Sequence, residues 1–205
     1  MADPFPTTQD LLSALHEGSA DQLIGLVLSE LIGQPLRSVG RTLDMIELGF
    51  GEDVLPRPLV YRGSDPDRAA EVARRNETPL PRVRLHVQCP FRLDSPSGPL
   101  LGGHDIYRDR RPPHERLDME SWSPSGKNAF DRLSARRVLL DPLEAGTMTV
   151  IGVHADRGGG FEISLVGGWS IHVGTASALI QEYWRLFYGD GLPTADHFVV
   201  FPDIA

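Results

Sequence analysis

Residues 147–173 read TMTVIGVHADRGGGFEISLVGGWSIHV, and this stretch decides the fold. Apolar and polar residues alternate on both sides of two glycine-rich turns, a pattern typical of strands joined by hairpins. It predicts three strands, at 147–155, 161–165 and 169–173, that form an antiparallel meander. His154 and His172 fall at outward positions of this meander, where solvent exposure is expected and a shared metal is the fainter alternative.

Other alternating stretches extend the predicted sheet to about six to eight strands. Residues 39–50 and 82–93 are the longest of these, and residues 197–201 predict a last short strand. Residues 19–32 predict an apolar helix with one buried face, and a first helix is expected to end at Gly18. The sequence therefore predicts an α+β protein with a mostly antiparallel sheet and N-terminal helices packed on one face.

The length of 205 residues is that of one ordinary domain, so residues 1–205 are predicted to form a single domain. Residues 51–81 and 108–128 are rich in proline and polar residues and are expected to be long excursions. Short helices are expected near 66–76, inside the first excursion, and over 128–140. Neither glycine-rich turn has the spacing of a phosphate-binding loop.

The chain is acidic, with 20 Lys and Arg against 28 Asp and Glu and a net charge of −8. Most of the acidic excess lies at the two ends, since residues 1–50 and 151–205 carry −5 and −4 respectively. This balance argues against nucleic-acid binding. A macromolecular partner would be expected to be basic, but the negative charge is explained first by the solubility that it gives the protein. The chain has no apolar stretch of membrane-spanning length and no secretory signal, so we expect a cytoplasmic protein. Its single cysteine, Cys89, fits a reducing compartment, and Lys127 as the only lysine indicates a GC-rich bacterial coding bias.

The candidate chemistry gathers on the polar side of residues 82–93. If this strand pairs with 100–107, His86 comes close to His104 and Asp105, a set that suits general base catalysis or metal binding. The alternative is a set of cross-strand polar pairs that hold the register. We expect the alternative, with no metal and no cofactor, because no nucleophile or third ligand stands out. An enzymatic activity is left open.

Four further residues are candidates for binding. They are Arg84, Gln88 and Arg92, which accompany His86, and Trp122, which lies in a polar loop. An exposed Trp122 would be a binding anchor, whereas a buried one would only pin the loop. A zinc or thiol–imidazole pair of His86 with Cys89 is disfavoured, because residues three apart in a strand face opposite sides.

A set of residues resembles a group of small bacterial proteins, common in actinobacteria, that carry an L-H-x-Q-C-P-[FW]-R core. The residues that carry the resemblance are Gly40-Arg41, Asp44-Met45, Phe50-Gly51, 85–92, Gly103, Asp105, Glu182 and Trp184-Arg185. The resemblance covers residues 36–201 and implies an association with immunity-type neighbours of secreted toxins. It implies no catalytic residue.

Three functions follow as hypotheses. The first is a non-enzymatic, immunity-like protein that binds a basic protein through an acidic surface. The second is a small-ligand binder or hydrolase-type enzyme with a polar pocket around His86, His104 and Asp105. The third is a structural homo-oligomer, such as a homodimer, formed through the apolar helix 20–32 or an edge strand.

Overall fold

The computed structural model describes residues 20–42, 45–55, 58–106, 137–174, 183–187 and 197–200. The helical elements are α2 (Ala20–Ser29), α3 (Pro66–Glu77), the short 3₁₀ helix η1 (Gly103–Ile106) and α5 (Arg137–Glu144). The strands are β1 (Leu36–Thr42), β2 (Met45–Val54), β3 (Leu80–Val87), β4 (Phe91–Ser95), β5 (Gly98–Gly102), β6 (Val150–Ala155), β7 (Phe161–Leu165), β8 (Trp169–Val173), β9 (Trp184–Phe187) and β10 (His197–Val200).

Within the described residues, the strands form two antiparallel sheets of five strands each. The first sheet has the order β1-β2-β3-β9-β10 and the second has the order β5-β4-β8-β7-β6. The α+β class with antiparallel sheets is confirmed, but the expectation of one sheet with six to eight strands is wrong. The reason lies in the predicted strand 82–93, which breaks at residues 88–90 and passes from the first sheet into the second.

The predicted meander is confirmed as β6, β7 and β8. Each strand pairs antiparallel with the next, with Val153 opposite Ile163 and Ile163 opposite Ile171. Gly167 and Gly168 in the second turn both have a φ of 81°, a left-handed conformation that glycine adopts without strain. β8 then pairs with β4, which extends the meander to the strand that follows the crossing.

The inner faces of both sheets contribute to one cluster of buried apolar side chains. α2 adds Ile24, Val27 and Leu28, whose spacing places them on one side of the helix, and Leu31 is buried in the turn that follows. The first expected helix, which ends at Gly18, lies outside the described residues. A pair of N-terminal helices on one face therefore stays a prediction.

Backbone hydrogen bonds join the two sheets at one corner. The chain that leaves α2 runs beside β6, where Val150 accepts from Gly33 N–H at 2.9 Å and donates to the Gln34 carbonyl at 3.0 Å. The indole Nε1 of Trp184, on β9, also donates to the Gly159 carbonyl in the β6–β7 turn at 2.7 Å. These contacts attach the start of β6 to the segment that leads into β1, and the turn after β6 to β9.

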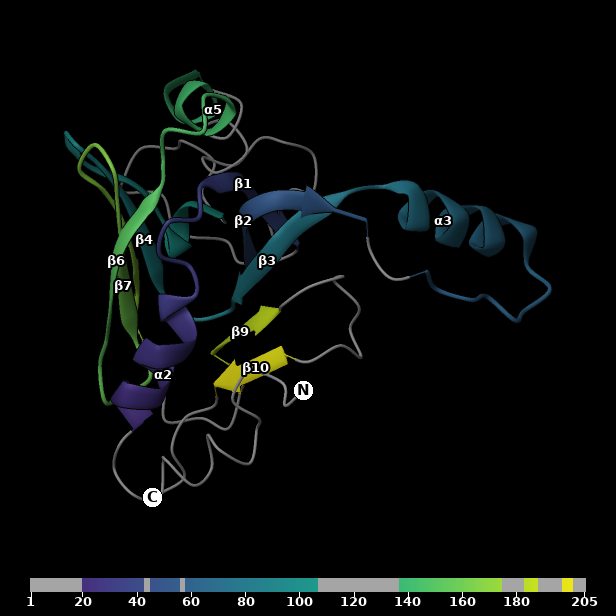
Figure 1. The fold of residues 1–205 in the computed structure, drawn as a ribbon, viewed down its shortest axis with the longest axis horizontal. Coiled ribbons are helices and arrows are strands. Elements are labelled where there is room, and N and C mark those ends of the chain that lie inside the picture. Colours follow the sequence, from purple (N-terminus) through teal and green to yellow (C-terminus); the bar gives the residue numbers. More distant parts are fainter. Residues whose placement is uncertain are drawn as a thin grey trace, which may run out of the picture.

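The expected excursion at 51–81 is shorter than predicted, because β2 continues to Val54 and β3 begins at Leu80. Its expected helix is confirmed as α3, which projects away from the sheets and buries no residue (Figure 1). The side chain of Asn76 holds the segment before the helix by a bidentate pair of hydrogen bonds to the backbone of Leu59. The excursion 108–128 lies outside the described residues, as does most of the predicted helix 128–140. The described helix α5 continues to Glu144, beyond the predicted end.

Candidate functional site

The structure separates the candidate residues from 84–105 onto two sheets. Arg84 and His86 lie on β3, which pairs with β2 and β9, while Arg92 lies on β4, which pairs with β5 and β8. The expected pairing of 82–93 with 100–107 is therefore right only for the segment after the crossing. It is wrong for His86, which has Glu47 and Arg185 as its cross-strand neighbours.

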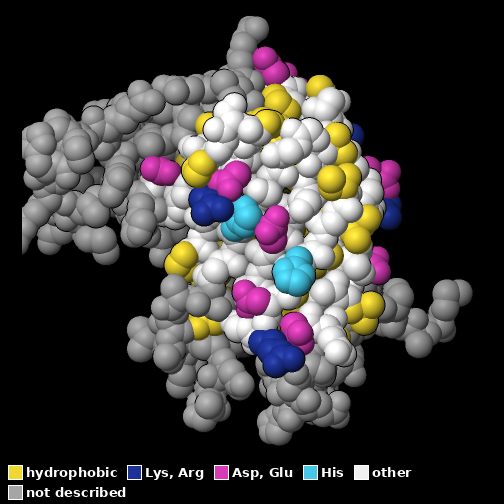
Figure 2. All heavy atoms as spheres, turned by 90° about the vertical axis from the view of Figure 1, so that its left-hand side faces the viewer, with side chains coloured by type: hydrophobic (Ala, Val, Ile, Leu, Met, Phe, Trp, Pro, Cys, Tyr) yellow, Lys and Arg dark blue, Asp and Glu magenta, His cyan; other side chains and the backbone are white. Residues whose placement is uncertain are grey.

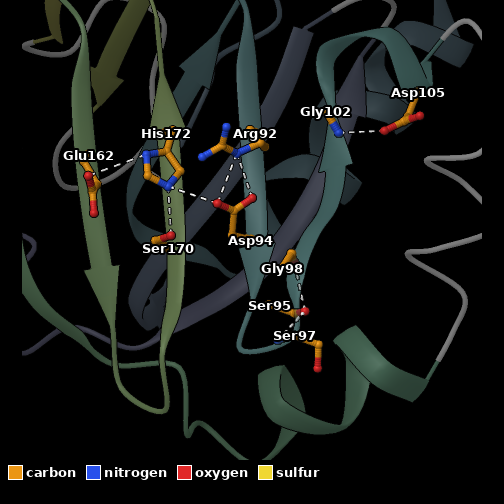
Figure 3. Close-up of polar contacts among 10 residues, drawn as sticks. All are labelled: Arg92, Asp94, Ser95, Ser97, Gly98, Gly102, Asp105, Glu162, Ser170 and His172. Carbon is orange, nitrogen blue, oxygen red and sulfur yellow. Dashed lines mark hydrogen bonds and ion pairs between the residues drawn. The ribbon is translucent and has the colours of Figure 1, made fainter.

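The remaining candidates do not assemble around His86. Asp105 lies in η1, where its Oδ2 accepts a hydrogen bond from Gly102 N–H at 2.7 Å, so this carboxylate stabilises the turn after β5 (Figure 3). Gln88 is exposed at the crossing, and its backbone N–H donates to the Tyr183 carbonyl at 2.8 Å. The side chain of His104 and the whole of Trp122 lie outside the described residues.

A network of polar side chains covers the outward face of the second sheet. It consists of Arg92, Asp94, Glu162, Ser170 and His172, and we call it the His172 network (Figure 3). The register explains it, because Arg92 and Glu162 lie opposite His172 on the two neighbouring strands, and Asp94 lies opposite Ser170. These positions alternate with the buried Leu93, Ile163 and Ile171, so strand periodicity alone turns them outward.

The imidazole of His172 lies between two carboxylates. Its Nε2 is 3.2 Å from Asp94 Oδ2, and its Nδ1 is 3.5 Å from Glu162 Oε2. Ser170 Oγ lies 2.9 Å from the same Nε2. Arg92 Nε donates to both oxygens of Asp94, at 2.8 and 3.0 Å. The network therefore links five side chains across β4, β7 and β8.

Ser170, His172 and Glu162 are the residue types of a serine–histidine–acid triad. The presence of Asp94 at Nε2 changes what this arrangement can do. Asp94 Oδ2 and Ser170 Oγ lie at the same ring nitrogen, so the carboxylate competes with the hydroxyl for the atom that would have to accept the serine proton. A network of this kind suits recognition of a partner better than activation of a hydroxyl.

His154 extends the same face by one strand. It lies opposite Glu162 on β6 and is exposed, as predicted from the sequence. Figure 2 shows acidic, histidine and basic side chains gathered on this face of the molecule. Within the described residues, no three His, Cys, Asp or Glu side chains are placed to hold a metal ion together.

A second group of side chains lies on the outward face of the first sheet. Arg84 and His86 on β3 lie opposite Phe187 and Arg185 on β9, and we call these four residues the Phe187 cluster. The Phe187 ring is 6 % exposed, and its centroid is 4.5 Å from that of the His86 ring. The guanidinium carbons of Arg84 and Arg185 lie 5.3 and 5.8 Å from the same centroid. Both distances are within the range of cation–π attraction.

Burial and two nearby charges act on the pKa of Arg84 in different directions. Partial burial lowers the pKa of Arg84, the carboxylate of Glu47 raises it, and the guanidinium of Arg75 on α3 lowers it. Burial and a second cation thus both act against the charged form of Arg84. The Phe187 cluster is a place where the fold brings positive charge together.

Cys89 belongs to the core rather than to a site. Its side chain is buried, and burial raises the pKa of the thiol to about 12. A thiol in this state is protonated and unreactive at neutral pH. His86 faces outward on β3, so the structure gives no support to a thiol–imidazole pair.

Sequence reasoning missed several members of both groups. Asp94, Glu162 and Ser170 occupy alternating polar positions, a signal that places them outward without showing that they meet. Arg185 and Phe187 lie in an aromatic stretch, residues 183–188, whose composition is typical of core packing as well as of binding sites. Comparison with protein-family models, curated protein sequences and solved structures found no match for this chain.

Proposed function

We propose that this protein is a non-enzymatic binding protein that docks a basic protein partner on the outward face of the second sheet. The observation that carries the proposal is the His172 network, in which Asp94 and Glu162 flank one imidazole on the outward face of the sheet. Glu162 is 44 % exposed, so its carboxylate is accessible to a cationic side chain of a partner.

The network suits recognition because its side chains are already ordered. Arg92 and Ser170 hold Asp94 and His172 in place, so a partner would not pay for ordering them. Opposite charges across such a contact give specificity and a rapid, salt-sensitive association. An immunity-like role, in which binding neutralises a toxin, is the form of this function that the family resemblance favours. No helix among the described residues is long and apolar enough to cross a membrane.

The test uses the tagged full-length protein as bait in lysate of the source cells, at low and moderate salt, with mass spectrometry as the readout. Glu162→Lys reverses one charge of the face, and Glu71→Lys reverses an exposed charge on α3 as the matched control. We expect one stoichiometric, basic partner that is retained by the wild type and by E71K, lost with E162K, and released by salt.

Two outcomes would contradict the proposal. One is a partner that E162K retains as well as the wild type does. The other is a partner lost with E71K and kept by E162K, which would place the contact on α3 instead.

The formation of a homodimer also stays a prediction. In and just after α2, Leu26 and Ile32 are 60 % and 48 % exposed, while four other apolar residues are buried.

A further inference from the structure

Three exposed apolar side chains lie where α2 runs beside the second sheet. They are Ile32 in the turn after α2, Ile151 on β6 and Val166 directly after β7, and we call them the seam strip. Ile151 and Val166 are 61 % and 44 % exposed. A single exposed apolar residue is ordinary on a protein surface, whereas a contiguous group of them is typical of an interaction site.

The backbone brings the members of the seam strip together. Gly33 N–H donates to the Val150 carbonyl at 2.9 Å, which places Ile32 beside Ile151. Val166 N–H donates to the Thr149 carbonyl at 2.8 Å, on the same stretch of β6.

A β-bulge accounts for the exposure of Ile151. Val150 pairs with Leu165 and Gly152 pairs with Ser164, so Ile151 is the extra residue on β6 and has no partner on β7. A bulge of this kind turns one side chain away from the regular alternation of its strand. Figure 2 shows hydrophobic side chains along one border of the face that carries the His172 network.

A row of small residues separates the seam strip from the charged side chains of the His172 network. Glu162 and Val166 are four residues apart along one strand direction, a separation of about 13 Å. Between them, Ser164 pairs with Gly152 on one side and with Ser170 on the other. A Cβ at Gly152 would meet no atom within 4 Å, so this row leaves open space above the sheet. Along β7 the outward face therefore passes from charged through small to apolar side chains.

The charge around the seam strip is negative. Residues 20–34 and 147–174, which hold α2 and the meander, contain four acids and one arginine, a balance of 1 − 4 = −3 with histidine neutral. The four acids are Asp21, Glu30, Asp156 and Glu162. The arginine, Arg157, lies 3.9 Å from Asp21, whereas Glu30 and Glu162 are exposed on the two sides of the strip. A partner with positive charge complements this surface.

We propose that the protein partner presents a basic amphipathic helix, which lies with its apolar side on the seam strip and with its cationic edge beside Glu162. A helix with its side chains is about 10–12 Å across, close to the separation of about 13 Å between Glu162 and Val166. A helix also carries its apolar and charged stripes side by side along its whole length. An extended segment directs alternate side chains to opposite sides, so half of them would face away. This inference rests on the proposed function and adds to it the form of the partner.

Isothermal titration calorimetry of the full-length protein with designed peptides tests the inference without the natural partner. The probe is a helical peptide of leucine and lysine with one apolar and one basic stripe, and the reference peptide has the same composition in an order that forms no stripe. We expect saturable binding of the probe, about tenfold tighter than that of the reference. Ile151→Ser and Glu162→Lys should each raise the Kd of the probe about tenfold. Val60→Ser is the matched control, because Val60 is an exposed apolar residue in the segment before α3, and it should leave the Kd unchanged.

Val166→Ser replaces Ile151→Ser in the test if the first variant does not fold. Absence of saturable binding of the probe, or an equal Kd for I151S, V166S and V60S, would overturn the inference. Equal binding of the two peptides, with a loss in E162K, would also overturn it and would leave the proposed function standing, which the lysate experiment tests separately. A dimer that light scattering detects in the wild type and not in I151S would assign the seam strip to a second copy of this chain instead.

Discussion

Trp184 joins the two sheets, and its replacement by phenylalanine is the sharpest test of how the fold holds together. The side chain is 0 % exposed, and its ring packs edge-on against Phe161 of the second sheet with centroids 4.9 Å apart. Its Nε1 donates a 2.7 Å hydrogen bond to the carbonyl oxygen of Gly159. Phenylalanine keeps an aromatic ring at this position and loses both the donor and part of the volume.

The magnitude follows from these two losses. A buried carbonyl left without its donor costs about 1–3 kcal/mol. The smaller ring leaves a cavity that costs about 1 kcal/mol more, because the surrounding core relaxes only in part. We therefore expect Trp184→Phe to lower the free energy of unfolding by about 2–4 kcal/mol, which leaves a typical domain folded.

Urea unfolding followed by far-ultraviolet circular dichroism measures this change, provided that the slope with denaturant stays constant. Trp169→Phe is the matched control, because Trp169 is only partly buried at the edge of the core. It should cost less than about 1 kcal/mol. A loss below about 1 kcal/mol for W184F, or equal losses for the two variants, would refute the role of Trp184 as the link between the sheets.

Three further predictions concern single positions. Gly160→Ala places a Cβ 2.8 Å from the Val173 carbonyl oxygen and should cost about 2 kcal/mol in urea unfolding, whereas Gly152→Ala has open space and should be nearly neutral. Burial raises the pKa of the Cys89 thiol from its ordinary value of 9.0 to about 12, so the folded state retains a proton that the unfolded chain loses. The free energy of unfolding should therefore fall as pH rises from about 9 toward 12. At pH 10 the wild type should have lost about 1.4 kcal/mol more of this free energy than Cys89→Ala has, because the variant has no thiol to titrate. Asp65→Ala removes the cap of α3, costs about 1 kcal/mol locally, and should speed hydrogen exchange in this helix without changing global stability.

Local periodicity predicted the meander and the outward position of its histidines. The alternation in β7 and β8 extends over whole strands, and the glycine turns between them restrict the pairing to neighbours. Under these conditions the order of the strands along the chain determines which strands pair and which residues share a face. The same reasoning placed Arg84 and His86 on the polar side of β3, where the structure has them.

Partners across distant strands were not predictable in this way. His172 meets Asp94 because β8 pairs with β4, and His86 meets Arg185 because β3 pairs with β9. Neither pairing joins strands that are consecutive in the chain. The alternation of polar and apolar residues in a strand is the same whichever strand pairs with it, so it does not identify the partner strand. The sequence therefore indicated which side chains face outward without indicating which of them meet.

The crossing at residues 88–90 explains why the run LHVQCPFR has two roles. Leu85, Cys89 and Phe91 point into the core on both sides of the crossing, and Cys89 and Phe91 are only 8 % and 7 % exposed. His86 and Arg92 occupy the outward positions, one on each sheet. The inward residues of this run are therefore needed for folding, whereas the outward residues belong to the Phe187 cluster and the His172 network. Substitution of Arg92 should thus change binding with little loss of stability, and substitution of an inward residue should do the reverse.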